Sequence, residues 1–312
     1  MKKNLITIIV PCYNEEKVIN LFYEEITSTI SCIHNYDFEI IFVDDGSSDK
    51  TLELIKDLSL KDTRIKYINF SRNFGKESAM LSGLEHSKGD FVCIMDADLQ
   101  HPPKLLYDMI DGVENGYDSV ATRRKNRIGE PKLRSYFAKL FYKIINKTSK
   151  IQITEAATDY RLMNRKMVDS ILKMCEYNRF TKGIFEWVGF KTKWIEIDNV
   201  ERAAGETSWS FYSLFTYAIE GIVSFSVAPL KIASFSGILI SILSIIYAIY
   251  IIMRTLILGI DTPGYASLIC IVLFIGGIQL ISIGIIGEYL SRTYLEVKNR
   301  PNYIINETNL KD

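Results

Sequence analysis

The stretch Asp90-Phe-Val-Cys-Ile-Met-Asp-Ala-Asp-Leu-Gln-His-Pro-Pro103 combines a candidate strand with two carboxylates at its end. Its apolar run, Phe91 to Met95, is short and rich in residues that favour strands, which predicts a buried strand. Asp96 and Asp98 follow at the far end, and Pro102-Pro103 ends the strand and opens a helix at Lys104. Ligands of open α/β sheets bind beyond the carboxyl ends of strands, so the two carboxylates mark a candidate site.

Strands and helices alternate on both sides of this stretch. Apolar periodicity predicts strands at 5–10, 38–43, 65–70, 91–95 and 118–122, and a short strand within 156–163. It predicts helices at 15–31, capped by Asn14, and at 51–60 and 75–86. Such alternation indicates βαβ units and a mostly parallel sheet, so the fold class is α/β. The loops at 11–15, 44–49 and 96–100 would then face one crevice.

The side chains of this crevice suggest nucleotide-sugar chemistry. Asp96 and Asp98 can converge on a divalent cation, with Gln100 as a neutral oxygen ligand, because Mg²⁺ sites combine one or two carboxylates with substrate phosphates. Asp44 or Asp45 can accept from a nucleobase N–H or a ribose hydroxyl. The alternative is that these acids only cap turns, as we expect for Asp49. The sequence contains no Gly-x-Gly-x-x-Gly or Walker pattern, which disfavours dinucleotide binding and ATP hydrolysis.

Two long uncharged segments occupy the last third of the chain. Ile232 to Met253 spans 22 residues and Thr262 to Gly287 spans 26. At about 1.5 Å per residue the shorter one covers roughly 33 Å, enough for a bilayer core of roughly 30 Å. The alternative is a buried helical hairpin. Two spans return the chain to its starting side, and the cations after the second favour the cytoplasm. We therefore expect a multi-pass protein of the cell membrane with a cytoplasmic catalytic domain.

The distribution of charge points to an anionic surface. The chain has 37 basic and 37 acidic residues, but 123–150 holds ten basic residues and one acid, Glu130. Lysines at helical spacing opposite an apolar face predict an interfacial helix at 133–150 on lipid headgroups. Nucleic acid could bind the same positive charge, but the nearby apolar segments favour lipid headgroups. One or two of these lysines are expected only to face solvent. A second interfacial helix is expected at 207–229. The five cysteines show no spacing typical of zinc or disulfides.

Several motifs together resemble the inverting family-2 glycosyltransferases, and most closely the branch that glycosylates polyprenyl phosphates, including dolichyl-phosphate mannose synthases and bactoprenol glucosyltransferases. They are Pro11-Cys-Tyr-Asn-Glu-Glu16, Val43-Asp-Asp-Gly-Ser-Ser-Asp49, Asn73-x-Gly-Lys76, Asp96-Ala-Asp-Leu-Gln-His-Pro-Pro103, Asp159-Tyr-Arg-Leu162 and Arg202-x-x-Gly205. Gly276-Gly-Ile-Gln-Leu280 and Gly287-Glu-Tyr-Leu290 are similar to the two-span bacterial members. The resemblance implies a GT-A catalytic domain, a membrane hairpin and often a tetramer.

The resemblance also implies roles for individual residues. The nucleotide would be held by Pro11, Tyr13, Glu15, Asp44, Asp45 and Asp96. Mg²⁺ or Mn²⁺ would be held by Asp96, Asp98 and Gln100, with Asp98 and Asp159 as the catalytic carboxylates. Phosphate contacts would come from Arg123, Arg127 and Arg202. Ser208 stands where members commonly carry Lys, a loss for which Lys182 could compensate.

These implications give an expected domain order and an expected reaction. We expect a catalytic domain at 1–206, an interfacial helix at 207–229, two spans at 230–290 and a cytoplasmic tail at 291–312, frayed from Asn306 to Asp312. The reaction would move a hexose, glucose from UDP-glucose by first choice, onto undecaprenyl phosphate. The alternatives are a mannosyl or N-acetylhexosaminyl donor, a polysaccharide synthase, and a non-enzymatic lipid-binding scaffold. A synthase should show more spans and a Gln-x-x-Arg-Trp motif.

Overall fold

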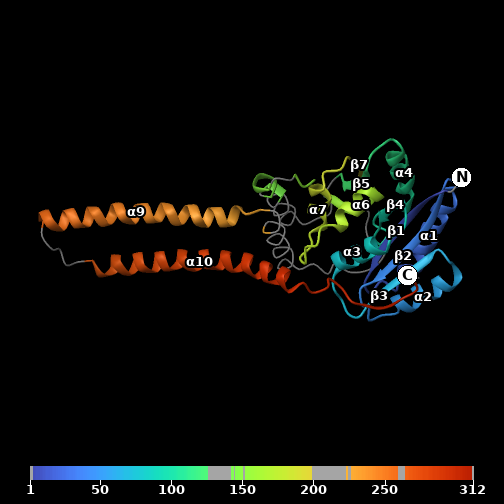
Figure 1. Cartoon of the computed structure of the whole chain (residues 1–312), viewed down its shortest axis with the longest axis horizontal. Helices are drawn as coiled ribbons and strands as arrows, with labels where there is room; N and C mark the ends of the chain where they lie inside the picture. The colour runs from blue at the N-terminus through green and yellow to red at the C-terminus, as the bar shows by residue number, and fades with distance from the viewer. Residues whose placement is uncertain are drawn as a thin grey trace.

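The computed structural model describes residues 3–125, 142–143, 145–149, 152–198, 223, 226–258 and 264–310. Within these residues, eight strands form one mixed sheet in the order β7-β5-β6-β4-β1-β2-β3-β8. Helices cover both faces of the sheet, and two long helices project away from it side by side (Figure 1).

The strands are β1 (Asn4–Cys12), β2 (Tyr36–Asp44), β3 (Ile65–Phe70), β4 (Phe91–Ile94), β5 (Ser119–Arg124), β6 (Ala157–Asn164), β7 (Thr192–Ile197) and β8 (Ile305–Thr308). The helices of the sheet domain are α1 (Ile19–Ser31), α2 (Thr51–Lys61), α3 (Lys76–His86), the short 3₁₀ helix η1 (Pro103–Leu105), α4 (Leu106–Glu114), α6 (Arg165–Leu172) and α7 (Thr181–Trp187). The long pair is α9 (Ala228–Leu258) and α10 (Tyr265–Lys298).

The parallel half of the sheet follows the predicted βαβ pattern. β1 lies between β2 and β4, and β3 follows β2, all in parallel. Successive residues of β1 point to opposite faces, because side chains alternate along a strand. Ile8 therefore belongs to the core cluster that contains residues of α1, α2 and α4, whereas Ile9 belongs to the cluster that contains residues of α3, α6 and α7. The carboxyl ends of β1, β2, β3 and β4 consequently lie along one rim.

The other half of the sheet is mixed. β6 runs antiparallel to both β4 and β5, while β5 and β7 are parallel. Because β6 is antiparallel, its first residues lie beside the last residues of β4. This arrangement brings Asp159, near the start of β6, to the same rim as Asp96, which follows β4.

Two local expectations were wrong. The first helix begins at Ile19 rather than at residue 15, and its N-cap residue is Val18, so Asn14 does not cap it. Asn14 instead has a left-handed backbone with φ 55°, and its Oδ1 accepts from the backbone N–H of Ser48 at 2.8 Å. The expected fraying from Asn306 is also wrong for the described residues up to 310, because β8 pairs with β3.

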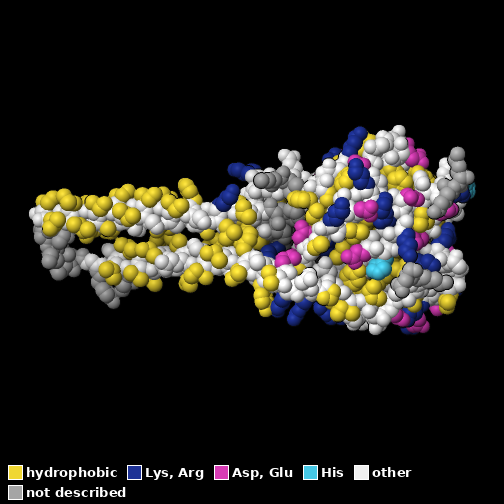
Figure 2. All heavy atoms as spheres, in the orientation of Figure 1, with side chains coloured by type: hydrophobic (Ala, Val, Ile, Leu, Met, Phe, Trp, Pro, Cys, Tyr) yellow, Lys and Arg dark blue, Asp and Glu magenta, His cyan; other side chains and the backbone are white. Residues whose placement is uncertain are grey.

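The two long helices have the length and composition of membrane spans. The candidate spans are Ala228–Arg254 and Ile271–Lys298, with mean hydropathies of 2.4 and 2.0. Their most apolar windows are not buried inside the protein. Hydrophobic side chains cover both helices, whereas charged side chains gather on the sheet domain (Figure 2). The expected interfacial helices at 133–150 and 207–229 fall largely outside the described residues.

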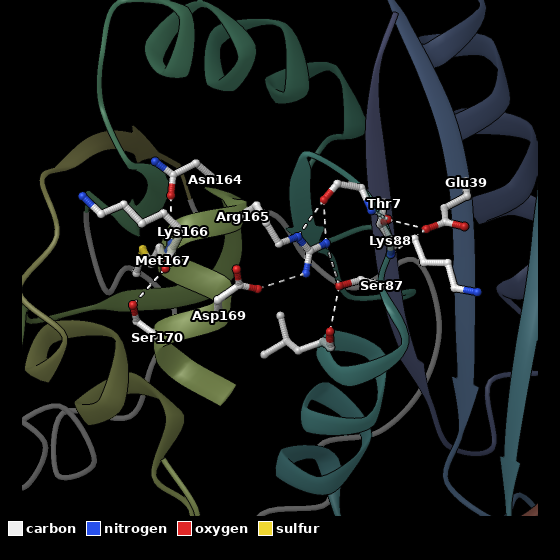
Figure 3. A network of polar contacts seen from close by, with 12 residues as sticks. Thr7, Glu39, Ser87, Lys88, Asn164, Arg165, Lys166, Met167, Asp169 and Ser170 are labelled. Carbon is white, nitrogen blue, oxygen red and sulfur yellow. Dashed lines mark hydrogen bonds and ion pairs between the residues drawn. The ribbon is translucent and has the colours of Figure 1, made fainter. Parts of the chain in front are cut away.

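A polar network fixes the start of β4 (Figure 3). Arg165, at the start of α6, donates from Nε to the Gly89 carbonyl at 2.9 Å and from Nη2 to Ser87 Oγ at 3.2 Å. The Gly89 N–H donates to Thr7 Oγ1 at 2.9 Å. A Cβ at Gly89 would lie 2.7 Å from the Thr7 backbone nitrogen, so no larger residue fits without movement. This network sets the position of β4 at the end of the strand opposite Asp96.

Candidate active site

The loops that follow β1 and β2 are tied together at the rim. The Asp45 N–H donates to the Cys12 carbonyl at 2.9 Å. The Asn14 N–H donates to Ser47 Oγ at 2.9 Å, and the Glu15 N–H to Thr51 Oγ1 at 2.8 Å. Asp49 accepts from the N–H groups of Glu16 and Thr51 at 3.1 and 3.0 Å, so it stabilises the start of α2. The two loops therefore form one wall of the predicted crevice.

Asp44 and Asp45 organise this wall from inside. Asp44 is fully buried and Asp45 is 3% exposed. Asp45 accepts from the backbone N–H groups of Phe74 and Gly75 at 2.6 and 2.9 Å, which holds the loop after β3. Asp44 accepts from Asn69 Nδ2 at 2.6 Å. Burial raises the pKa of Asp44. Burial also raises the pKa of Asp45 to about 6, although the hydrogen bonds from the Phe74 and Gly75 N–H groups act to lower it.

Lys76 joins two predicted site carboxylates. Its Nζ lies 2.6 Å from Asp96 Oδ1 and 2.8 Å from Asp159 Oδ2, so α3, the loop after β4 and β6 meet at one ammonium group. Desolvation opposes the charge of Lys76, but Asp159 and Asp96 outweigh it and raise the Lys76 pKa above its ordinary value. For Asp159, burial acts to raise the pKa, but the charge of Lys76 and then of Lys182 holds it well below its usual range. Asp159 is therefore an anion at neutral pH.

Glu77 binds the start of α7, where Lys182 lies, and so brings this lysine near Asp159. Glu77 accepts from the Thr181 N–H at 3.1 Å and from the Thr181 hydroxyl. Lys182, the next residue of α7, is one of the charges that lower the Asp159 pKa. Burial, and then the charge of Asp159, raises the Glu77 pKa to about 7. Glu77 thus connects α3 to α7 across the site.

The Asp98 side of the rim carries the other predicted ligands. Asp98 Oδ1 accepts from the Gln100 N–H at 3.1 Å, and Gln100 Oε1 accepts from Arg124 Nη2 at 3.4 Å. His101 is 5% exposed, and its Nδ1 has no hydrogen-bond partner among the described residues. Burial lowers the His101 pKa, although Asp96 and Asp98 act in the opposite direction.

The donor set fits a divalent cation that also binds phosphate. The described residues contain no group of three or more His, Cys, Asp or Glu side chains that could hold a metal ion by themselves. Mg²⁺ typically takes one or two carboxylates plus substrate phosphates, so Asp96 and Asp98 with the Gln100 amide would suffice only together with a diphosphate. The buried imidazole of His101 feels the charges of Asp96 and Asp98, and its Nδ1 has no hydrogen-bond partner among the described residues. Lys76 already occupies Asp96 Oδ1, so such a cation would compete with it for that oxygen.

The remaining predicted residues are placed as follows. Pro11 lies within β1, and Tyr13 is 48% exposed in the loop after it. Arg123 on β5 pairs with its register partner Glu196 on β7 at 2.6 Å, and both side chains are exposed. Arg127, Arg202 and Ser208 lie outside the described residues.

Sequence reasoning missed the roles of Lys76, Glu77 and Arg124. Lys76 stands in the Asn73-x-Gly-Lys76 motif directly after β3, and that position on the rim is a signal that could have placed it in the site. Nothing local marks Glu77 or Arg124, because their partners are 104 and 24 residues away.

The comparisons with known proteins agree with both parts of the chain. Residues 7–172 match glycosyl transferase family 2, and residues 228–293 match the GtrB C-terminal hairpin. The putative glycosyltransferase CsbB of Bacillus subtilis (strain 168) is 49% identical over 99% of this chain and 94% of its own. The prophage bactoprenol glucosyl transferase homolog of Escherichia coli (strain K12) is 41% identical over 96% of this chain and 98% of its own. The bactoprenol glucosyl transferase of Shigella phage SfII is 40% identical over 97% of this chain and 98% of its own.

A solved structure is similar at lower identity. Glucosyl-3-phosphoglycerate synthase from Mycobacterium tuberculosis, in complex with Mn²⁺, UDP-glucose and phosphoglyceric acid, has a TM-score of 0.48 and 16% identity over 70% of this chain and 78% of its own. The family and hairpin matches confirm the predicted α/β GT-A class with its C-terminal hairpin. The chain belongs to glycosyl transferase family 2, within the group that carries the GtrB-type hairpin.

Proposed function

We propose that the protein transfers a glucosyl group, with inversion, from UDP-glucose to a polyprenyl phosphate, with undecaprenyl phosphate as the natural acceptor. The observation that carries the proposal is the meeting of Asp96 and Asp159 on Lys76 at the sheet rim, in a chain that also holds two apolar helices long enough to cross a bilayer. The names of relatives along nearly the whole chain support the lipid acceptor and the glucosyl group.

The acceptor needs little chemical activation. The second pKa of a phosphate monoester is about 6, so its oxygen is already anionic near neutral pH. That oxygen attacks C1 of the sugar, the bond between C1 and the diphosphate oxygen breaks, and UDP leaves with the bonding electrons. No proton has to be removed from the nucleophile. We therefore assign Asp159 to charge balance and acceptor orientation, since Lys76 and Lys182 keep it ionised.

The rim residues bind and orient the two substrates. The buried Asp44 holds the turn that borders the nucleoside, because its Oδ1 accepts from the Ser47 N–H at 3.4 Å. Asp45 holds the backbone of Phe74 and Gly75 so that Lys76 reaches the centre of the site. Lys76 and Lys182 supply positive charge where two phosphate groups must approach each other. When bound, a divalent cation held by Asp96, Asp98 and Gln100 would supply charge for the departing diphosphate.

A lipid acceptor also explains the hairpin. The phosphate of a polyprenyl carrier lies at the headgroup plane, so the crevice must stay close to a membrane surface. α9 and α10 would anchor it there with the sheet domain on the cytoplasmic side. The 133–150 segment would face the lipid headgroups, and Arg127 and Arg202 would contact phosphate. The domain order 1–206, 207–229, 230–290 and 291–312 and a homotetramer are parts of the same proposal.

Labelled donors test the reaction. Membranes that contain the protein would be incubated with undecaprenyl phosphate and with labelled UDP-glucose, UDP-N-acetylglucosamine or GDP-mannose. We expect a labelled lipid that carries one glucose, formed only from UDP-glucose and lost with EDTA. Protease protection of the sheet domain in sealed vesicles would test the orientation. Transfer that is unchanged after exhaustive chelation would refute the metal assignment, and transfer without a prenyl carrier would refute the acceptor.

A further inference from the structure

The chain after α10 returns to the rim of the sheet. Asn299 ends α10 with a left-handed backbone, φ 46°. The ring of Tyr303 then stacks on Phe70, at the end of β3, with ring centroids 4.9 Å apart and an interplanar angle of 16°. β8 follows and pairs antiparallel with β3, as Figure 1 shows for the red segment beside the blue half of the sheet. The segment that leaves the hairpin thus ends beside the loops of the proposed donor site.

β8 carries an irregularity at the rim. Asn69 pairs with Glu307 and Phe70 with Ile305, so Asn306 is an extra residue in the register. Such a bulge turns the side chain of the extra residue away from its regular direction, and bulges are frequent next to active sites. Here Asn306 Nδ2 donates to Asn69 Oδ1 at 3.0 Å.

Asn69 also binds a buried carboxylate, that of Asp44. Asn69 is 5% exposed and is the register partner of Asp44 on β2. Its Nδ2 donates to Asp44 Oδ2 at 2.6 Å. An ionised carboxylate only accepts hydrogen bonds, so the Asn69 amide must turn its NH₂ toward Asp44 and its oxygen toward Asn306. Asn306 therefore donates to the amide oxygen of Asn69, which an ionised Asp44 cannot do because it has no proton to donate.

We infer that Asn306 is a positioning residue of the donor site, which acts through Asn69 and the buried Asp44 carboxylate to hold the turn at 44–47, where Asp44 Oδ1 accepts from the Ser47 N–H at 3.4 Å. The inference rests on the proposed function, in which the loops after β1 and β2 border the nucleotide of the donor. Under this inference β8, the strand after the hairpin, supports the nucleotide pocket. The pairing of β8 with β3 and the binding of the nucleotide then depend on each other.

Calorimetric titration of UDP into the full-length protein in nanodiscs tests this role. A neutral hydrogen bond of this kind corresponds to about a 3- to 10-fold change in an equilibrium constant. We expect Asn306→Ala to weaken UDP binding and raise the KM for UDP-glucose by about that factor, with kcat at saturating donor unchanged. Glu307→Gln is the matched control, because Glu307 lies on the same strand but pairs with Lys56 Nζ at 2.5 Å. It should leave UDP affinity unchanged.

Two further variants separate positioning from folding. Asn306→Asp keeps the shape of the side chain but removes its donor, so it should weaken UDP binding while the thermal midpoint stays within a few degrees of wild type. In the Asn69→Ala background, Asn306→Ala should add no further loss, since the path to Asp44 is already broken. Unchanged UDP affinity in both Asn306 variants, or additive losses with Asn69→Ala, would overturn the inference. If the wild-type protein bound no UDP, the proposed donor itself would be wrong.

Discussion

Replacing Lys76 with methionine tests the centre of the site. The change keeps much of the length of the side chain but removes the ammonium that lies 2.6 Å from Asp96 and 2.8 Å from Asp159. A hydrogen bond to a charged group contributes about 1.5–3 kcal/mol. The Lys76 side chain is 43% exposed, so solvent screens both contacts and the lower end of that range applies.

The expected loss is about 2–3 kcal/mol for the two contacts together, or about 30- to 150-fold in kcat/KM. The assay is transfer from labelled UDP-glucose to undecaprenyl phosphate, with donor and acceptor varied in turn. Lys76→Met should also reach half-maximal activity at a lower Mg²⁺ concentration, because the ammonium no longer competes for Asp96 Oδ1.

Lys56→Met is the matched control for this variant. Lys56 also forms a lysine–carboxylate pair, with Glu307 at 2.5 Å, and its side chain is 38% exposed, but it lies on α2 away from Asp96 and Asp159. Its kcat/KM should stay within about twofold of wild type, as is usual for exposed ion pairs. Activity of Lys76→Met within about threefold of wild type, in a protein with normal thermal stability, would refute the role of Lys76.

The sequence predicts the parallel strands well because their signals are local. β3 spans Ile65–Phe70, the predicted range, because a short run with strand-forming residues is bounded by turns on both sides. The carboxylates of the site were found for a related reason. Asp96 and Asp98 directly follow a strand, and parallel strands that share an edge must bring such residues together. Asp159 is different, because it lies near the start of the antiparallel strand β6 and only the family resemblance implied its role.

The errors arise where a partner distant in the sequence decides the structure. Asn14 has the residue type of a helix cap, but it binds Ser48, which is 34 residues away. β8 has the sequence Ile-Asn-Glu-Thr, with little apolar alternation to mark a strand. It forms because β3 offers an open edge and because Tyr303 packs on Phe70. The pairing of Lys76 with Asp159, which is 83 residues further along the chain, is hidden for the same reason.

The remaining predictions concern one catalytic group, one stability determinant and one titrating acid. Asp159→Asn should lower kcat/KM by at least tenfold at saturating metal and donor, because Lys76 and Lys182 would lose their counter-charge; near wild-type turnover would remove Asp159 from the catalytic set. Gly89→Ala should lower the free energy of unfolding by about 1–3 kcal/mol, seen as a lower thermal midpoint, because its Cβ would lie 2.7 Å from the Thr7 nitrogen; Gly116→Ala, where no atom lies within 4 Å but φ is 82°, is the control for backbone strain alone. Glu77→Gln should flatten the dependence of stability on pH. In the folded protein the Glu77 pKa is raised from 4.5 to about 7, so between these values the folded state binds more protons than the unfolded state. The free energy of unfolding that this group contributes is therefore fully present below pH 4.5 and is lost as the pH rises toward 7. Glutamine still accepts from the Thr181 N–H but does not titrate, so thermal midpoints measured across this window should fall less steeply in the variant, and equal slopes for the two proteins would show that Glu77 is not the titrating group.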